Sequence, residues 1–227
     1  MTGYYNEFEY NGMRVVVSSG APDHEAEHDQ LKNNPNTRCE RWQFMQVPLN
    51  PAKGSGEATS LGTIGLAVTG GGFFNHLSNP DGSLALTNEG PTLDSCLGHS
   101  AGGGTYHYHA NINCTDAGAA TGANDVDTCL KIGYYRDGVP VYGFCKDSSG
   151  VQMTSCYSLK SASSTSTVVT VSGTYIAAST SSDYEYSSTS DCNLDEGNGK
   201  INVIHTLAKL SISQVQSTPP QGNTPTS

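Results

Sequence analysis

The chain has few basic side chains. Its 227 residues include 11 Lys and Arg against 21 Asp and Glu, which gives a formal net charge of −10 at pH 7. Proteins that bind nucleic acids neutralise phosphates with clustered Lys and Arg. We therefore expect no nucleic-acid partner.

Long hydrophobic runs are also missing. A membrane-spanning helix needs about 20 consecutive, mostly apolar residues, and no stretch of this sequence approaches that length. We therefore expect no membrane span. Sustained helical periodicity is scarce as well. The best helix candidate is residues 24–32, which follow Pro22-Asp23, a pair that favours a helix start.

Short, strand-length runs dominate instead. They are rich in β-branched and aromatic residues and are separated by turn signals such as Asp137-Gly138. The 26 glycines predict tight turns and long Gly-rich loops. We expect an all-β fold, a sandwich or jelly-roll-like arrangement with one or two short helices. The predicted strands are residues 13–17, 61–68, 106–110, 131–135, 139–144, 167–171 and 201–204.

Composition divides the chain into three parts. Residues 1–13 form an aromatic N-terminal segment, residues 14–200 a β domain, and residues 201–227 a C-terminal strand with a Pro/Thr-rich tail. Within the domain, 20 of the 38 residues from 154 to 191 are Ser or Thr. This stretch is either a set of solvent-exposed strands and loops or a surface that carries O-linked glycans.

The seven cysteines are dispersed, and none belongs to a Cys-x-x-Cys pair. Zinc ribbons and thioredoxin-type sites depend on that spacing, whereas dispersed cysteines in an acidic chain are typical of disulfide-bonded extracellular proteins. Cys145 and Cys156 bracket a short turn, and Cys96 and Cys114 bracket a histidine motif, so both pairs are disulfide candidates. The odd count leaves one free thiol or one bridge to another chain.

We expect an extracellular location on this cysteine usage and composition. The sequence opens Met1-Thr2-Gly3-Tyr4-Tyr5 and lacks the charged and apolar regions of a secretory signal at that point. We interpret it as a mature or partial chain.

The most informative motif is the alternation Tyr106-His107-Tyr108-His109. Successive side chains of a β-strand point to opposite faces, so the two histidines share one face and the two tyrosines share the other. His99 lies eight residues before His107, across three consecutive glycines. The pattern predicts a strand with a site on one face and a core layer on the other.

Three imidazoles with a carboxylate are a common ligand set for metal ions. We predict a metal site formed by His99, His107 and His109, with His24 and Asp94 as further candidates. The sequence does not distinguish among copper, zinc and calcium as the divalent ion. The alternative is that the histidines form a hydrogen-bonded network without an ion.

Several spaced motifs surround this strand. Asp94-x-Cys96-x-Gly98-His99 followed by Gly104-x-Tyr106-His107-Tyr108-His109 is similar to the signature that gives the YHYH domain family its name. The Pro-Asp-His motif at residues 22–24, the Gly-rich strand at 64–71 and the Asp-Gly-x-Pro-x-Tyr-Gly block at 137–143 match in order. The resemblance covers roughly residues 14–144. It implies a secreted or periplasmic β-rich domain and no settled reaction.

Two functions are open. The first is an extracellular structural or binding subunit that forms homo-oligomers, as a filament, through its terminal segments. The aromatic residues 4–10, the alternating strand in 201–215 and the Pro/Thr-rich tail favour it, since exposed aromatics often anchor interfaces. The second is a secreted metal-dependent enzyme whose three histidines leave a position for water or substrate. We favour the first, which is not an enzyme.

Overall fold

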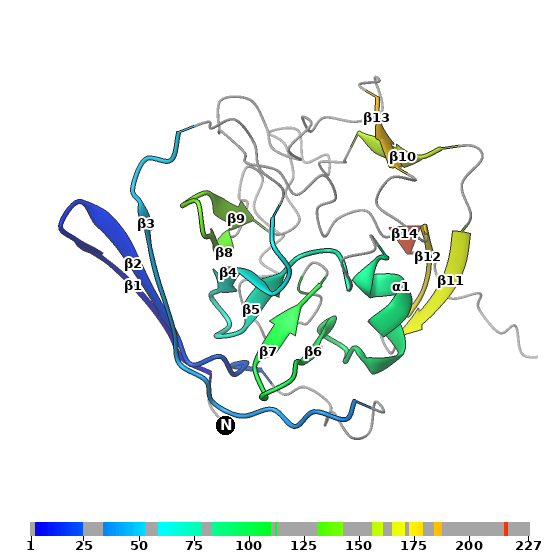
Figure 1. Cartoon of the computed structure of the whole chain (residues 1–227), viewed down its shortest axis with the longest axis horizontal. Helices are drawn as coiled ribbons and strands as arrows, with labels where there is room; N and C mark the ends of the chain where they lie inside the picture. Colours follow the sequence, from blue (N-terminus) through cyan, green and yellow to red (C-terminus); the bar gives the residue numbers. More distant parts are fainter. Residues whose placement is uncertain are drawn as a thin grey trace, which may run out of the picture.

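The structure is a computed structural model, and it describes residues 3–24, 34–52, 59–78, 83–109, 112, 131–142, 156–160, 165–170, 173–178, 184–187 and 216–217. Over these residues the chain forms four β-sheets and little helix (Figure 1). The predicted all-β fold is confirmed.

The largest sheet has six strands in the order β6-β7-β5-β4-β8-β9. Neighbouring strands are antiparallel except β5 and β7, which run parallel. The strand of the histidine motif, β7, therefore lies between β6 and β5. The six strands are β4 (Thr63–Ala67), β5 (Gly72–Phe74), β6 (Gly98–Ser100), β7 (Tyr106–Tyr108), β8 (Lys131–Tyr135) and β9 (Pro140–Tyr142).

A three-stranded antiparallel sheet packs against the large one. It consists of β1 (Tyr5–Tyr10), β2 (Met13–Ser18) and β3 (Gln43–Pro48), in that order. Asn11 and Gly12 both have positive φ and form the tight β1–β2 turn, a conformation that Asn-Gly pairs favour. One face of this sheet forms a core cluster with the large sheet, which makes the two sheets sandwich-like. The cluster contains Val16, Met45, Val47, Leu66 and Tyr134.

The other described elements are short. Helix α1 (Ala85–Glu89) continues directly into the 3₁₀ turn η2 (Gly90–Thr92). Strands β10 (Tyr157–Leu159) and β13 (Tyr184–Tyr186) pair with each other. Strands β11 (Thr165–Thr170), β12 (Gly173–Ala178) and β14 (Gln216–Ser217) form a further sheet. Among the described residues, no helix has the length and apolar character needed to cross a membrane.

Most predicted strands correspond to observed ones. Those expected at residues 13–17, 61–68, 106–110, 131–135, 139–144 and 167–171 overlap β2, β4, β7, β8, β9 and β11. The strand expected at 201–204, and the helix expected at 24–32 beyond its first residue, lie outside the described residues. The short helix α1 was not anticipated at its position, because five residues are too few to show a helical period.

The two tyrosines of β7 form the centre of the main core. Tyr106 and Tyr108 are fully buried, and each hydroxyl has a polar partner. Tyr106 donates to Oδ2 of Asp94 at 2.6 Å, and the Tyr108 hydroxyl lies 2.7 Å from Nε2 of His24 and 2.8 Å from Oγ1 of Thr69. The core face predicted for these tyrosines is confirmed, and the cost of burying their hydroxyls is offset by hydrogen bonds.

Three cysteines lie in the described part of the chain. Cys96 and Cys156 each take part in a disulfide bond. Cys39 is a free, exposed thiol. Cys114 and Cys145, the partners expected for Cys96 and Cys156, lie outside the described residues. The two expected pairings stay predictions.

We predict that Gly98 is required for packing of the Tyr106 ring. A Cβ atom at Gly98 would lie 2.5 Å from Cζ of Tyr106, and a close-packed core leaves the ring little room to move. Gly98→Ala should lower the free energy of unfolding by about 1–3 kcal/mol, as measured by chemical denaturation. Gly102→Ala is the matched control, because a Cβ there meets nothing within 4 Å. Equal losses in the two variants would contradict this account.

Candidate metal centre

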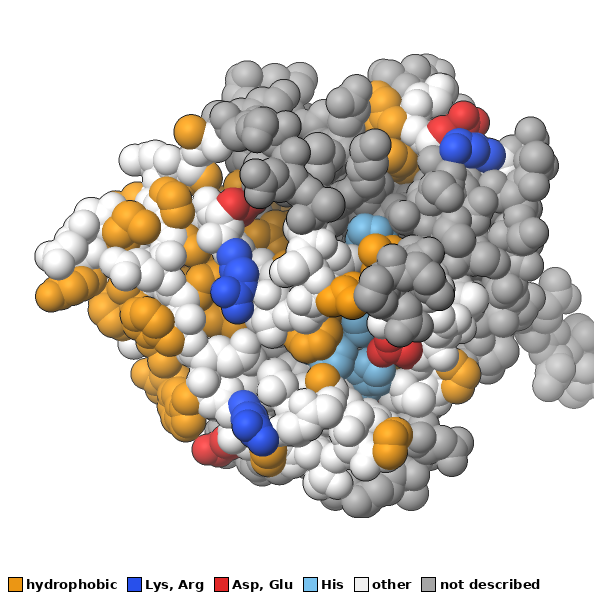
Figure 2. Space-filling view, viewed as in Figure 1, with side chains coloured by type: hydrophobic (Ala, Val, Ile, Leu, Met, Phe, Trp, Pro, Cys, Tyr) orange, Lys and Arg blue, Asp and Glu red, His pale blue; other side chains and the backbone are white. Residues whose placement is uncertain are grey.

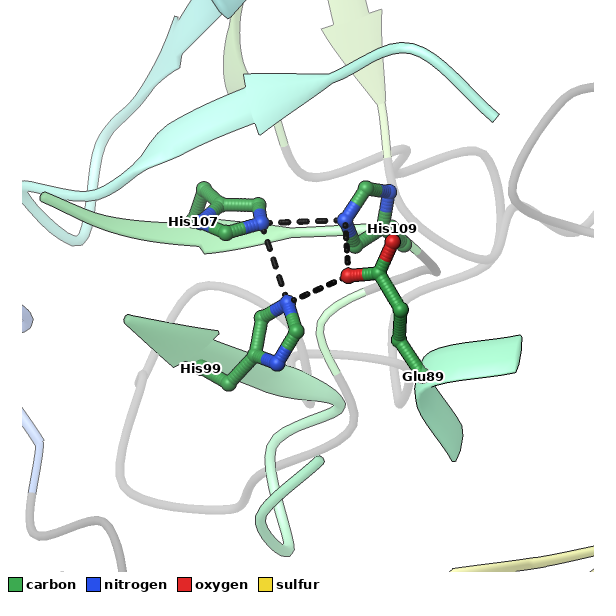
Figure 3. Close-up of side chains that lie close together, drawn as sticks. All are labelled: Glu89, His99, His107 and His109. Carbon is green, nitrogen blue, oxygen red and sulfur yellow. Dashed lines mark hydrogen bonds and ion pairs between the residues drawn. The ribbon is translucent and has the colours of Figure 1, made fainter. Parts of the chain in front are cut away.

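Four side chains from three segments converge beside β7, as Figure 3 shows. His99 comes from β6, His107 from β7, His109 from the first residue after β7, and Glu89 from the last residue of α1. One ligand atom of each lies within 4.8 Å of those of the other three. The structure therefore brings together the three predicted histidines and adds a glutamate.

The ligand atoms have the spacing of a metal coordination shell. Nε2 of His107 lies 3.1 Å from Nε2 of His99 and 2.9 Å from Nε2 of His109. Oε2 of Glu89 lies 3.0 Å from Nε2 of His99 and 3.4 Å from Nε2 of His109. With metal–ligand bonds of about 2.0–2.1 Å, neighbouring ligand atoms lie about 2.9–3.4 Å apart. The residues fit a small transition-metal ion.

Strand pairing explains why the histidines meet. His99 and His107 are directly opposite each other in the antiparallel β6–β7 pair, and opposed residues of two strands share a face. His109 follows two positions after His107 and therefore lies on the same side. Gly103 and Gly104, with φ of 86° and 87°, form the turn that makes this pairing possible.

Two of the rings are fixed by backbone carbonyls. Nδ1 of His109 lies 2.9 Å from the carbonyl oxygen of Asn75, and Nδ1 of His107 lies 3.3 Å from that of Thr105. A carbonyl oxygen only accepts hydrogen bonds. In the neutral form of either ring, Nδ1 therefore carries the proton, and Nε2 is left with its lone pair.

In His99 too, Nδ1 carries the proton, and here its partner is a hydroxyl. Oγ1 of Thr92 donates its one proton to the carbonyl oxygen of Glu89 at 2.7 Å, and it lies 2.6 Å from Nδ1 of His99. Nδ1 of His99 must then be the donor in the second contact. In their neutral forms, all three imidazoles thus direct an Nε2 lone pair to one place, where the Glu89 carboxylate also points.

Such an arrangement needs a positive charge at its centre. Three lone pairs and a carboxylate oxygen at 2.9–3.4 Å repel one another unless a metal ion or added protons lie between them. Histidine ligands of metals commonly donate their other N–H to a carbonyl or another acceptor, which fixes the ring for the ion. The outward hydrogen bonds of all three rings follow this rule.

The electrostatics of the site favour a cation. Burial, together with the charges of His109 and His99, holds the pKa of His107 well below its ordinary value, so that ring stays neutral. Burial alone would raise the pKa of the Glu89 carboxyl, but hydrogen bonds with His109 and His99 outweigh it and lower that pKa well below its usual range. The site offers a neutral ligand at His107 and a negative one at Glu89.

The centre lies near the surface. The three histidines are buried, whereas the side chain of Glu89 is 29% exposed. The Phe74 ring stacks on His107, with ring centroids 3.7 Å apart. Figure 2 shows histidine atoms next to an acidic side chain near the middle of the visible face. An ion can reach the site without unfolding of the core.

His24 and Asp94, the other two predicted ligands, lie outside this cluster. The Asp94 carboxylate accepts hydrogen bonds from the Tyr106 hydroxyl and from the backbone N–H groups of Cys96 and Gly98. His24 contacts the hydroxyl of Tyr108 and lies 3.2 Å from Sγ of Cys96. Both therefore belong with the tyrosine face of β7, and their polar atoms are used within the core.

Two residues near the centre were not found from the sequence. Glu89 lies ten residues before His99 in a short helix, and no spacing rule connects the two. His76 is a further imidazole near His109, and Nδ1 of His76 is buried with no partner among the described residues. Burial and the charge of His109 lower the pKa of His76. Only the three-dimensional structure places either residue here.

A family model described as YHYH protein matches residues 44–210. The chain belongs to the YHYH family. The match includes all four residues of the cluster, and it begins within β3, so β1 and β2 precede it. Comparison with curated proteins and with solved structures gave no match. In this YHYH protein the two tyrosines of the family motif form core and the two histidines contribute to the cluster.

We predict that Thr92 controls metal affinity without touching the ion. Thr92→Val removes the acceptor of the His99 Nδ1–H bond while keeping the shape of the side chain. Loss of such an outer hydrogen bond should weaken metal binding about 10–100-fold, measured by competition with a chromophoric chelator. Thr92→Ser, which keeps the hydroxyl, should retain most of the affinity. Equal affinity in wild type and Thr92→Val would contradict the role of this contact.

Proposed function

We propose that this YHYH protein is an extracellular metal-binding domain whose centre, formed by Glu89, His99, His107 and His109, holds one divalent transition-metal ion. The main support is the common orientation of the three rings, with every Nδ1 hydrogen-bonded outward and every Nε2 directed inward. Three nitrogen ligands argue against calcium, which takes oxygen ligands. Copper and zinc suit imidazole.

The ion would act as a structural cross-link. It would join the end of α1 to β6 and β7, two strands that already pair with each other through their backbones. Because the ligands are brought together only in the folded chain, the binding free energy adds to folding stability. This role agrees with the non-enzymatic function favoured by the sequence.

Metal removal should destabilise the protein. We expect one ion per chain by elemental analysis after back-loading. A free ion concentration 100 times Kd should add about 2.7 kcal/mol to the free energy of unfolding. Glu89→Gln should lose most of the bound metal and most of the added stability, because it removes the charged ligand from a partly exposed position. Glu9→Gln on the exposed part of β1 is the control. No bound metal, or equal occupancy in the two variants, would disprove the proposal.

We also propose that the protein functions outside the cell. The support is the low number of basic residues, the dispersed cysteines and the disulfide-bonded state of Cys96 and Cys156. Glycans on the Ser/Thr-rich residues 154–191 remain part of this prediction.

Self-association is a second proposal, and the outer face of the β1–β2–β3 sheet supports it. Strand alternation and register place eleven residues on this face, and none of them is charged although the chain has a net charge of −10. Five of the eleven are aromatic side chains that are 45–66% exposed. Hydrophobic side chains gather along this side of the molecule (left in Figure 2). The five are Tyr4, Phe8, Tyr10, Trp42 and Phe44.

A second copy suits this face because two uncharged surfaces approach without charge repulsion, which two acidic proteins otherwise experience. Strand β1 also lies at the edge of its sheet, where a further strand can pair. At the other end of the chain, Gln216 and Ser217 pair with β12 of the same chain. A face that contacts its own equivalent gives a closed dimer, and a face that contacts a different surface gives a filament unless the rotation closes into a ring.

Charge on the outer face should weaken self-association. Phe44→Glu introduces a carboxylate at the most exposed of the five aromatic positions. It should raise the dissociation constant Kd of the self-associated state about 30-fold or more, as expected for loss of an interface hot spot. Sedimentation velocity measures this constant. Tyr142→Glu is the control, because Tyr142 is similarly exposed but lies on β9. Electron microscopy then separates dimers from filaments. Wild-type protein that stays monomeric at high concentration would refute the proposal.

A further inference from the structure

The four ligand atoms of the metal centre form a closed ring, and this ring restricts the kind of ion that fits. Following the contacts in Figure 3, the ring passes from His99 to His107 and His109, then to Glu89 and back to His99. Its four sides are 3.1, 2.9, 3.4 and 3.0 Å. His107 and Glu89 are therefore opposite corners, and so are His99 and His109.

One pair of opposite corners, His107 and Glu89, is farther apart than the neighbours. Within the described residues, ion pairs of 4.0 Å or less join Glu89 to His99 and His109 but not to His107, while the whole set lies within 4.8 Å. The imidazole rings show the same pattern. Ring centroids of neighbours are 4.6 and 4.7 Å apart, and those of His99 and His109 are 5.5 Å apart.

These distances distinguish two coordination geometries. In a tetrahedral site with bonds of about 2.0–2.1 Å, all six ligand–ligand distances are about 3.3 Å. In a square site with similar bonds, the four sides are about 2.9 Å and the two diagonals about 4.1 Å. Three sides of 2.9–3.1 Å and a His107–Glu89 diagonal above 4.0 Å are closer to the square arrangement than to the tetrahedral one.

We infer that the centre is a tetragonal site with three nitrogen ligands and one oxygen ligand, built for Cu(II) rather than for tetrahedral Zn(II). This inference rests on the proposed metal-binding function. Tetragonal nitrogen and oxygen sets are typical of Cu(II) and Ni(II), and Cu(II) has the higher affinity of the two. The four ligands include no thiolate or thioether, the soft groups that select Cu(I).

Electron paramagnetic resonance of the full chain loaded with one equivalent of Cu(II) tests the inference. We expect the axial spectrum of tetragonal Cu(II), with superhyperfine splitting from three nitrogen nuclei. His109→Gln should reduce the coupled nitrogens from three to two. Co(II) substitution is the second measurement, because tetrahedral Co(II) gives intense visible bands and Co(II) of higher coordination gives weak ones.

The outcomes separate this inference from the proposed function. An axial spectrum with three nitrogens, together with weak Co(II) bands, supports the tetragonal site. One bound metal ion with a tetrahedral Cu(II) spectrum and intense Co(II) bands overturns it and leaves the metal-binding domain intact. No binding of Cu(II), Zn(II) or Co(II) by the native full-length chain overturns both.

Discussion

The position of β7 between β6 and β5 is the constraint on which the rest of the domain depends. Its antiparallel pairing with β6 sets His99 opposite His107, and its parallel pairing with β5 brings Phe73 beside Tyr108. Because side chains alternate along a strand, one three-residue element supplies both the buried tyrosines of the core and part of the histidine cluster. A shift of one residue in this register would exchange the two faces.

The cluster is pre-organised by groups that do not contact its centre. The outward hydrogen bonds of the three imidazoles end on the segment after β5, on η2 and on the residue before β7. Each bond fixes the orientation of one ring and the nitrogen that carries the proton. Ordering these side chains has a conformational entropy cost, and this cost arises when the chain folds, before an ion binds. A metal ion that binds there meets ligands already in place, which favours both affinity and a defined geometry.

The two candidate functional regions use different physics. The metal centre depends on converging lone pairs and a carboxylate next to the core. The outer face of β1–β2–β3 depends on exposed aromatic area and on the absence of charge from that face of the described strands. Strands β1 and β2 precede the part matched by the family model, whereas the cluster lies wholly inside it.

The sequence by itself determined the all-β fold, most strand positions and the two faces of the Tyr-His-Tyr-His strand, because these follow from local composition and from the two-residue period of a strand. It also indicated that His99 joins the pair. Only the tertiary structure decided which carboxylate completes the cluster. Asp94, close to the motif in sequence, is held by a buried tyrosine hydroxyl and two backbone N–H groups. Glu89 has its backbone in a short helix and its side chain directed at the histidines. That choice depends on how distant segments pack, and no local pattern in the sequence encodes it.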